Sequence, residues 1–434
     1  MSDRSRGNMF HPRIHIDTGV APIETLITFG DLSVGKPLKG GKGGRVSGWM
    51  KIGLREMPDR FRVVLSKPFF DKLLLDGKNK MGTWEKLAEK LGITYGSLVG
   101  IRNGRIRSIS VAALKTLAPI AGETLDEIEK NCSYTLKVQS APIKIPISST
   151  PQLAALVAHA LGDGSIGRKH FQVEYKNKNL ECIQEVLEAV KSVFNIQVSI
   201  AEYERNVYSA MLPSTIGHIL CIAGAIPGNK TKKDFDVPDW IKNGSFEVKR
   251  SFLRALFNDE GSVYIGSKSS NIKIFMGKEA SKKESLMKFL ESIQRMLMDF
   301  GIKSKRIRIS REYQVGNQKK VIVGFWITGK RNLRAFTDRI GLCPTKQKKL
   351  ELAIDSYKNR IWGEEVEDEI LRILHTEGPK KTTELSKILK RKGRASLLKH
   401  LRKLKANQDV SFSKYRLANG LCGFRWYTKK RVGR

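Results

Sequence analysis

The sequence predicts a mixed α/β fold of the α+β kind, in which a duplicated αββαββα core is flanked by a small helical domain on each side. Two observations predict the core. Two apolar helical stretches, each ending in an acid followed by glycine, place their acids 97 residues apart, and a similar order of strands and helices follows each stretch. A third observation predicts the flanks, because short amphipathic helices separated by tight turns occur on both sides of the repeat.

Changes of composition along the chain predict six parts. A proline-containing stretch separates the first flank from the repeat, and a strongly basic segment follows the repeat. The predicted parts are a basic flexible arm at 1–48, a helix-turn-helix domain at 49–137, a linker at 138–151, the two repeats at 152–245 and 246–357, and a winged-helix-like basic domain at 364–434.

The composition favours a nucleic-acid partner. The 434 residues include 79 Lys and Arg against 43 Asp and Glu, which leaves a formal net charge of +36. A surplus of this size on a foldable chain points to a polyanion, and double-stranded DNA is the partner that we expect. No run of about 18 apolar residues could span a membrane, and the N-terminus lacks the apolar region of a signal peptide. We therefore expect a cytoplasmic protein with no membrane partner.

The cysteines and histidines show no metal-binding pattern. The five cysteines form no C-x-x-C pair and the seven histidines no H-E-x-x-H spacing, which argues against a zinc site and against a disulfide framework. We expect reduced, mostly buried thiols, and we expect His159, on an apolar helical stretch, to be packed rather than to bind a metal. Any metal should therefore be held by oxygen.

The first flank shows helix-turn-helix spacing. Helices are predicted at 84–91 and 94–102, with a stop at Gly92 between them. This pattern resembles the DNA-binding unit of phage-repressor-type proteins, although any packed three-helix unit can look similar. Arg102 and Arg105 are its candidate DNA contacts.

The second flank has the outline of a winged helix. A helix with acids in its first turn is predicted at 364–376, two more helices follow, and a hairpin turns at Asn419-Gly420. Residues 379–434 contain 18 basic and 2 acidic residues. A solvated charged face would also explain this charge, but its concentration on the third helix favours phosphate contact. The candidate contacts there are Arg394, Lys399 and Arg402.

The two repeats carry the chemistry. The stretches QLAALVAHALGDGSI and SFLRALFNDEGSV end in Asp163 and Glu260. Either stretch alone would be an ordinary helix end. Two in register predict a pair of helices packed about a pseudo-twofold axis, each about 12 residues and ~18 Å long, that bring both carboxylates to the same end. Asp259 should point elsewhere on its helix. The small residues that would allow close approach are Ala155, Ala158, Gly162 and Ala255.

The segments LVAHALGDG (156–164) and LRALFNDEG (253–261) resemble the motif of the LAGLIDADG (DOD-type) homing endonucleases. The resemblance covers roughly residues 150 to 355. It implies a site-specific double-strand DNA endonuclease in which Asp163 and Glu260, at the eighth motif position, bind the catalytic divalent metal, Mg²⁺ or another such as Mn²⁺. It also implies a cut across the minor groove, and we expect a monomer without a small-molecule cofactor.

The same resemblance implies lysines close to the metals. Basic segments follow corresponding helices of the two repeats, and Lys230 and Lys346 are the candidates for polarising water or the phosphate. Solvated basic turns would explain these lysines equally well. Lys176 and Lys278 are rival positions.

The strands of both repeats are expected to form a curved surface in the major groove, where alternate side chains reach base edges. Because the repeats are not identical, the expected target is asymmetric. The candidate base-reading residues are Gln172, Glu174, Lys176, Glu202, Glu204, Lys273, Arg306, Arg308, Ser310 and Gln314.

Two other functions stay open. A non-cleaving DNA-binding regulator on the same fold would be expected to have lost one carboxylate, whereas both acids are present here. No feature of the sequence discriminates against an RNA-splicing maturase. Inteins also carry this nuclease domain, but the Met-Ser start and the Val-Gly-Arg end lead us to expect a free-standing, two-motif protein.

Overall fold

The computed structural model describes residues 50–136, 142–204, 206–266, 269–357, 364–389, 394–416 and 422–428. The predicted basic arm at 1–48 and the Asn419-Gly420 turn lie outside these ranges. No helix among the described residues is both long and apolar enough to cross a bilayer.

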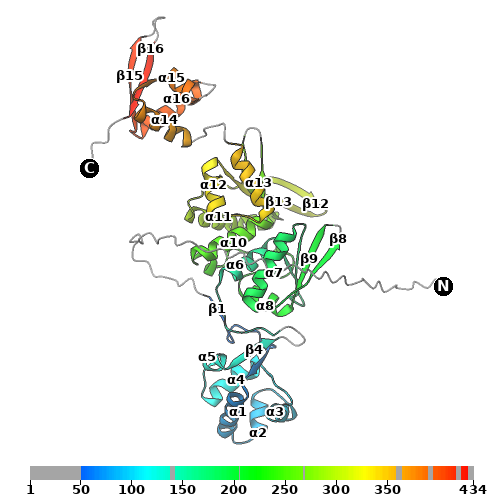
Figure 1. Ribbon diagram of the computed structural model, residues 1–434. Coiled ribbons are helices and arrows are strands. Elements are labelled where there is room, and N and C mark those ends of the chain that lie inside the picture. Colours follow the sequence, from blue (N-terminus) through cyan, green and yellow to red (C-terminus); the bar gives the residue numbers. More distant parts are fainter. Residues whose placement is uncertain are drawn as a thin grey trace, which may run out of the picture. The chain divides into compact units, whose positions relative to one another are not determined.

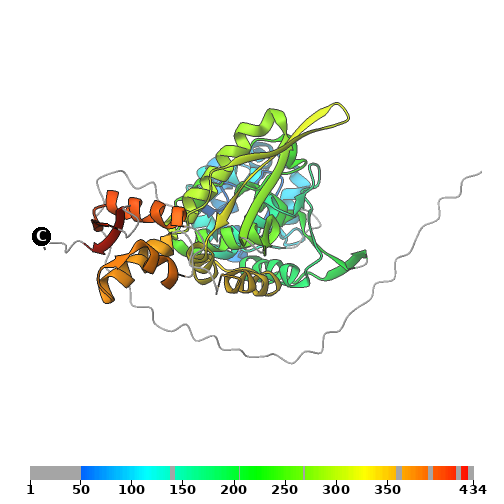
Figure 2. The same cartoon turned by 90° about the horizontal axis from the view of Figure 1, so that it is seen from above.

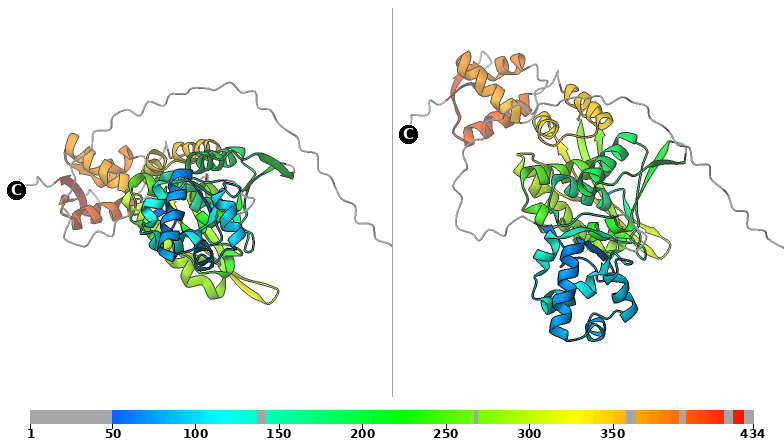
Figure 3. Two further views of the ribbon diagram at one scale, coloured as in Figure 1. Left: turned by 90° about the horizontal axis from the view of Figure 1, so that it is seen from below. Right: turned by 60° about the horizontal axis from the view of Figure 1, so that its bottom comes forward.

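Among the described residues, the N-terminal part, coloured blue to cyan in Figure 3, contains five helices and a three-stranded sheet. Threonine and serine side chains begin its later helices, for example Thr83 and Thr94, whose hydroxyls accept the backbone N–H of Lys86 and Ser97. The helices are α1 (Lys67–Met81), α2 (Trp84–Lys90), α3 (Tyr95–Arg102), α4 (Val111–Ala121) and α5 (Leu125–Lys130). The sheet has the order β3 (Ile109–Ser110), β2 (Arg62–Leu65), β4 (Cys132–Leu136), and a separate pair joins β1 (Lys51–Ile52) to β5 (Ile147–Ser148).

The middle of the chain contains the αββαββα unit twice, which confirms the predicted fold class. The first copy comprises α6 (Pro151–Leu161), β6 (Ser165–Ile166), β7 (Val173–Asn177), α7 (Leu180–Phe194), β8 (Ile200–Glu204), β9 (Val207–Leu212) and α8 (Ser214–Ile222). The second comprises α10 (Phe246–Asp259), β10 (Gly261–Tyr264), β11 (Asn271–Glu279), α11 (Lys283–Asp299), β12 (Arg308–Val315), β13 (Gln318–Thr328) and α12 (Lys330–Arg339).

The two sheets have equivalent strand orders, β6-β7-β9-β8 and β10-β11-β13-β12, and every neighbouring pair is antiparallel. Hairpins β8–β9 and β12–β13 extend beyond the helices (Figures 1 and 2). Alternation explains which face is buried: on β11, Ile272 and Ile274 are buried and Lys273 between them is exposed. A single face of each sheet therefore packs on the helices and the other faces solvent.

Short helical segments follow each repeat. After the first come the 3₁₀ turn η1 (Lys230–Lys232) and α9 (Asp239–Lys242), and after the second comes α13 (Pro344–Asp355). A further 3₁₀ turn, η2 (Ala280–Lys282), precedes α11. These segments matter for the site because η1 and α13 carry two of the predicted lysines.

The C-terminal part has its own hydrophobic core, which includes Val366, Leu385, Leu401 and Trp426. In the described stretches of this part, three helices and a three-stranded sheet surround the core. They are α14 (Glu364–Thr376), α15 (Thr382–Ile388) and α16 (Arg394–Ala406), with strands in the order β14 (Lys380–Lys381), β16 (Cys422–Thr428), β15 (Val410–Arg416).

The expectation of mostly buried thiols is wrong. All five cysteines are free, but only Cys182 and Cys343 are buried, whereas Cys132 and Cys221 are half-buried and Cys422 is exposed. Position explains the exposed thiol, because Cys422 is the first residue of β16 and lies at the exposed end of that strand, away from the core.

Candidate active site

The two motif helices, α6 and α10, lie against each other at the centre of the repeated core (Figure 1). Each begins at a capping hydroxyl: Thr150 accepts from Leu153 N–H at 3.1 Å, and Ser245 accepts from Val248 N–H at 3.3 Å. Ala158 and Ala255 are buried where the helices pack. This packing carries Asp163 and Glu260 toward one another at the C-terminal ends of the pair.

The two helix ends differ. Helix α6 ends at Leu161, and Gly162 leaves the helical conformation with φ −84° and ψ −119°, so Asp163 lies outside the helix. Helix α10 continues to Asp259, and Glu260 remains helical with its N–H donating to Leu256 O at 2.9 Å. Asp163 therefore projects from the turn after α6, whereas Glu260 projects from the last turn of α10.

A glycine follows each acid because the chain turns back onto the helix. A Cβ at Gly164 would lie 2.8 Å from the carbonyl oxygen of His159, and a Cβ at Gly261 would lie 2.4 Å from that of Phe257. Any side chain at these positions would have to displace backbone. The repeated acid-glycine pattern thus reflects the same close approach in both repeats.

A lysine binds the end of each motif helix. Lys230 of η1 donates through Nζ to the carbonyl oxygens of Ala160, Leu161, Gly162 and Gly164. Lys346 of α13 donates to the carbonyl oxygens of Asn258 and Gly261. Carbonyl groups at a helix C-terminus lack partners within the helix, and cations are favoured there. The two predicted lysines therefore occupy corresponding positions beside the two acids.

Burial and mutual repulsion disfavour the charged forms of the acids. Although Asp163 keeps an exposed surface, loss of hydration and then the Asp259 charge raise its pKa to about 6. Burial, followed by the charge of Asp163, raises the pKa of Glu260 to about 7. The cations of Lys230 and Lys346 oppose both increases. Burial also lowers the pKa of Lys230, against the raising effect of Glu260.

The arrangement suits a cation that keeps part of its hydration shell. Within the described ranges, no three or more His, Cys, Asp and Glu side chains cluster as a metal cage. Two neighbouring carboxylates with raised pKa values form an oxygen-only donor set, which a hard divalent cation would relieve of repulsion. Asp163 and Glu260 therefore fit Mg²⁺ or Mn²⁺ bound jointly with substrate and water.

The rival lysines differ in their surroundings. Lys278 is buried, its Nζ donates to Lys233 O at 2.6 Å, and it lines a cavity of about 90 Å³ together with Glu260 and Lys230. Burial lowers the pKa of Lys278 to about 8. Lys176 instead pairs with Glu174 at 2.9 Å on the first sheet. Of the two rivals, Lys278 is the one beside an acid of the site.

The side chain of Asp259, the residue before Glu260, points into the first repeat. This side chain is fully buried and accepts from Tyr175 OH at 2.6 Å, from His159 Nδ1 at 3.1 Å, and from Asp163 N–H at 3.2 Å. Burial alone lowers the pKa of His159, but the Asp259 charge raises it above its ordinary value. His159 is packed in the interface, as expected for a histidine on an apolar helix.

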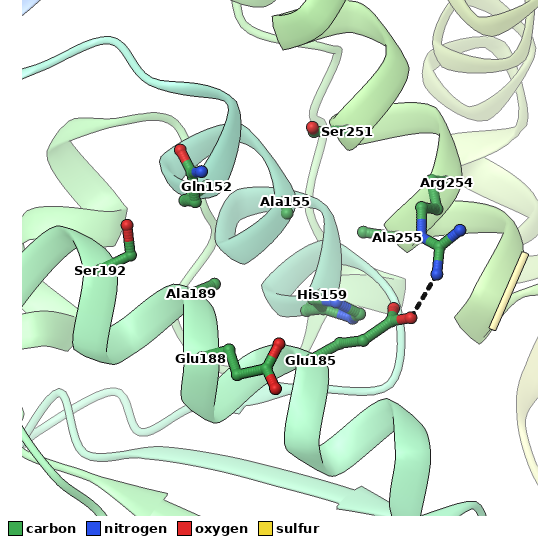
Figure 4. A pocket seen from close by; sticks show the side chains of 10 residues that line it. All are labelled: Gln152, Ala155, His159, Glu185, Glu188, Ala189, Ser192, Ser251, Arg254 and Ala255. Atoms are coloured by element: carbon green, nitrogen blue, oxygen red, sulfur yellow. Dashed lines mark hydrogen bonds and ion pairs between the residues drawn. The ribbon is translucent and has the colours of Figure 1, made fainter. Parts of the chain in front are cut away.

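A groove of about 410 Å³ lies between α6, α7 and α10 (Figure 4). Arg254 and Glu185 form an ion pair beside it, which joins α10 to α7, and His159 lines the groove between them. Asn258 adds a second link by donating to Glu185 Oε2 at 2.9 Å. These contacts link the C-terminal half of α10 in the second repeat to α7 of the first.

The predicted base-reading residues lie on the sheets and the segments next to them. Lys273 and Arg308 are exposed on β11 and β12, with the guanidinium of Arg308 5.5 Å from the centre of the Trp326 ring. Arg306, just before β12, is also exposed, whereas Lys176 lies 3.4 Å from the centre of the Tyr203 ring and is half-buried. Gln172, Glu202, Ser310 and Gln314 are exposed, Glu174 is half-buried, and the Glu204 side chain lies outside the description.

The candidate DNA contacts of the two flanking parts lie on or next to α3 and α16, far in sequence from the two acids. Arg102 ends α3 with its guanidinium 3.9 Å from the centre of the Trp84 ring, and Arg105 is exposed in the turn that follows. Lys399 and Arg402 are exposed on α16. Arg394 begins that helix, but its side chain is outside the described part.

Sequence reasoning missed the side chains that surround Asp163. Tyr175 and Asn177 stand on β7, and Asn177 Nδ2 donates to Asp163 Oδ2 at 3.1 Å and to Tyr175 OH at 3.2 Å. The only signal was alternation along HFQVEYKN, which separates the two faces of the strand without showing which face meets the site.

Comparison with known proteins identifies the second repeat. Residues 247–341 match the family model described as a LAGLIDADG-like domain. The match extends from the first turn of α10 to the residues after α12. It confirms the family resemblance found in the sequence.

Curated relatives share only part of their length with this chain. Glutamine–fructose-6-phosphate aminotransferase of Methanocaldococcus jannaschii is 28% identical over 287 residues, which cover 65% of this chain and 24% of that protein. The tRNA-splicing ligase RtcB of Pyrococcus furiosus is 30% identical over 207 residues, covering 43% and 21%. The chain thus spans about a quarter or less of these relatives, whose named activities differ from one another.

Similar solved structures include I-DmoI in complex with DNA and Mn, with 14% identity and a TM-score of 0.30 over 44% of this chain and 96% of that one. Full-length DUF199/WhiA from Thermatoga maritima has 15% identity and a TM-score of 0.32, covering 59% of this chain and 90% of that one.

Proposed function

We propose that this chain, which contains a LAGLIDADG-like domain, is a site-specific double-strand DNA endonuclease that depends on a divalent metal. One observation carries the proposal: each repeat delivers one carboxylate and one lysine to the adjoining ends of α6 and α10. Two equivalent half-sites suit a substrate with two strands, because each acid can serve one scissile phosphate.

Asp163 and Glu260 would hold Mg²⁺ or Mn²⁺. The bound cation would supply an activated water and stabilise the leaving oxyanion of a phosphodiester. The chain's part is to fix the two carboxylates and to place positive charge around the phosphate. Lys230 and Lys346 fit that second role, since both hold a helix end beside an acid. Lys278 is the rival for this role next to Glu260.

DNA binding would spread over the sheets and the flanks. Exposed basic side chains on β11, β12, α3 and α16 provide phosphate and base contacts, and the net charge of +36 supports a large electrostatic share. The helix-turn-helix and winged-helix assignments belong to this proposal. Binding should weaken steeply as salt rises, because each phosphate contact releases counterions.

The test begins with selection of a cleavage site from a randomised DNA library. Purified protein with Mg²⁺ should linearise a plasmid that carries the selected site, and Asp163→Asn should abolish linearisation while leaving DNA binding intact. Glu188→Gln, which changes an exposed acid on α7, serves as the matched control. Full linearisation by Asp163→Asn would remove Asp163 from the mechanism.

The same experiment separates the other functions. A non-cleaving DNA-binding regulator would select a site by retention but leave it uncut with any divalent metal. A maturase would retain intron RNA and promote its splicing. Cleavage that requires both Asp163 and Glu260 favours the endonuclease over both.

A further inference from the structure

The seventh position of the motif differs between the repeats in a complementary way. It is Gly162 in the first and Asp259 in the second, and the two face each other between the helices. A Cβ at Gly162 would lie 2.6 Å from Asp259 Oδ2. The first repeat therefore leaves a space that an acid of the second repeat fills.

Within the described residues, the three groups that donate hydrogen bonds to the Asp259 side chain all belong to the first repeat. Tyr175 OH, His159 Nδ1 and Asp163 N–H donate to it, and the carboxylate has no solvent exposure. A buried carboxylate that accepts several hydrogen bonds is held rigidly, since losing a partner would leave charge unsatisfied. Asp259 is therefore a fixed anchor contributed across the interface.

The backbone at Asp163 needs such an anchor, whereas that at Glu260 does not. Glu260 N–H is satisfied inside its own helix by Leu256 O. Asp163 lies beyond the end of α6, and its N–H donates to Asp259 Oδ2 instead. Asn177 Nδ2 binds the carboxylate of Asp163 by donating to its Oδ2, and it also donates to Tyr175 OH. A closed chain of hydrogen bonds thus surrounds Asp163 and passes through Asp259.

We propose that Asp259 is a positioning residue that sets the place of the Asp163 carboxylate, and through it the cleavage of one of the two DNA strands. The inference rests on the endonuclease function proposed above. Of the two acids, Asp259 is hydrogen-bonded to Asp163 alone within the described residues, and its carboxylate is occupied by Tyr175, His159 and the backbone of Asp163. Removing it should affect the half-site of Asp163 far more than that of Glu260.

The experiment measures both strands separately. A duplex carrying the selected site, with a different fluorophore on each strand, is cut under single-turnover conditions with Mg²⁺. Because misplacing a catalytic group by about 1 Å can cost about a hundredfold in rate, Asp259→Asn should slow one strand by about 30- to 100-fold and the other by less than about threefold. The reaction should then accumulate nicked duplex. Equal rates on both strands, slowed or unslowed, would overturn the proposal.

Two further variants guard against simple misfolding. Tyr175→Phe removes one donor to Asp259 without changing the size of the side chain, and should slow the same strand by a smaller factor. Arg254→Gln removes an ion pair between the repeats at Glu185 without touching Asp163, and should change both strands alike (Figure 4). A strand bias in Arg254→Gln equal to that of Asp259→Asn would assign the effect to general loosening and contradict the inference.

A second measurement does not depend on cleavage. Hydrogen exchange of the peptide containing Asp163 should be faster in Asp259→Asn than in the wild type, because its N–H loses its acceptor. If the Asp163 peptide exchanges at the same rate in Asp259→Asn and in the wild type, Asp259 does not hold the backbone of Asp163 and the proposal is wrong. Wild-type protein that cuts neither strand but shows this difference would contradict the proposed function alone.

Discussion

The ends of the two motif helices hold their acids in place by different contacts. At the end of α10 the helix itself carries Glu260, and Lys346 binds two carbonyl oxygens there. At the end of α6 the helix stops early, Lys230 binds four carbonyl oxygens, and Asp163 depends on contacts from the other repeat. The comparison teaches that duplicated halves can each keep one carboxylate and one lysine while different contacts hold the carboxylate in place.

The largest expected effect comes from removing each acid in turn. Asp163→Asn and Glu260→Gln should each reduce double-strand cleavage by about a thousandfold or more, because each removes a proposed ligand of the cation that activates water. Strand-resolved cleavage should show a different strand left intact in each variant. If both variants spare the same strand, the idea of two half-sites is wrong.

The two lysines should differ in their contribution to stability. Lys230→Met leaves four carbonyl oxygens without this donor and should destabilise folding by about 2 to 4 kcal/mol, whereas Lys346→Met leaves two and should cost about 1 to 2 kcal/mol. Urea unfolding of both variants measures the difference. A larger loss for Lys346→Met would reverse the comparison.

The acids should make the metal-free protein less stable as pH rises. The pKa values of Asp163 and Glu260 are raised in the folded state to about 6 and about 7, so the folded protein holds protons that the unfolded chain has released. The contribution of these two acids to stability should fall between about pH 4 and pH 7, by about 2 to 3 kcal/mol from Glu260 alone. Thermal unfolding without metal tests this, and Glu260→Gln should flatten the profile. A pH profile that Glu260→Gln leaves unchanged would contradict the raised pKa of Glu260.

Effects of similar size on stability, without a direct effect on the chemistry, are expected at the two glycines that follow the acids. Alanine at either position brings a Cβ against a helix carbonyl, at 2.8 Å for Gly164 and 2.4 Å for Gly261. We expect destabilisation of about 1 to 3 kcal/mol for each, and more for Gly261→Ala. Thermal melts of the two variants measure the order. No change in either would mean that the turns adjust freely.

The sequence predicted the fold class through periodicity, because acids before glycine recur at matched places in two similar patterns of strands and helices. It also placed Lys230 and Lys346, which the structure brings to equivalent helix ends. The contacts of Asp259 could not be predicted. They depend on the rotation between α6 and α10 and on which face of β7 carries Tyr175, and both are properties of packing rather than of local pattern.

The seventh motif position is Gly162 in the first repeat and Asp259 in the second, and this difference limits how the protein can be re-engineered. A symmetric dimer made from the first repeat would oppose two glycines and leave a void between its helices, while one made from the second would oppose two carboxylates with no imidazole or phenol to receive them. Chimeras that transplant one half into another scaffold must therefore carry the seventh motif position together with its partner.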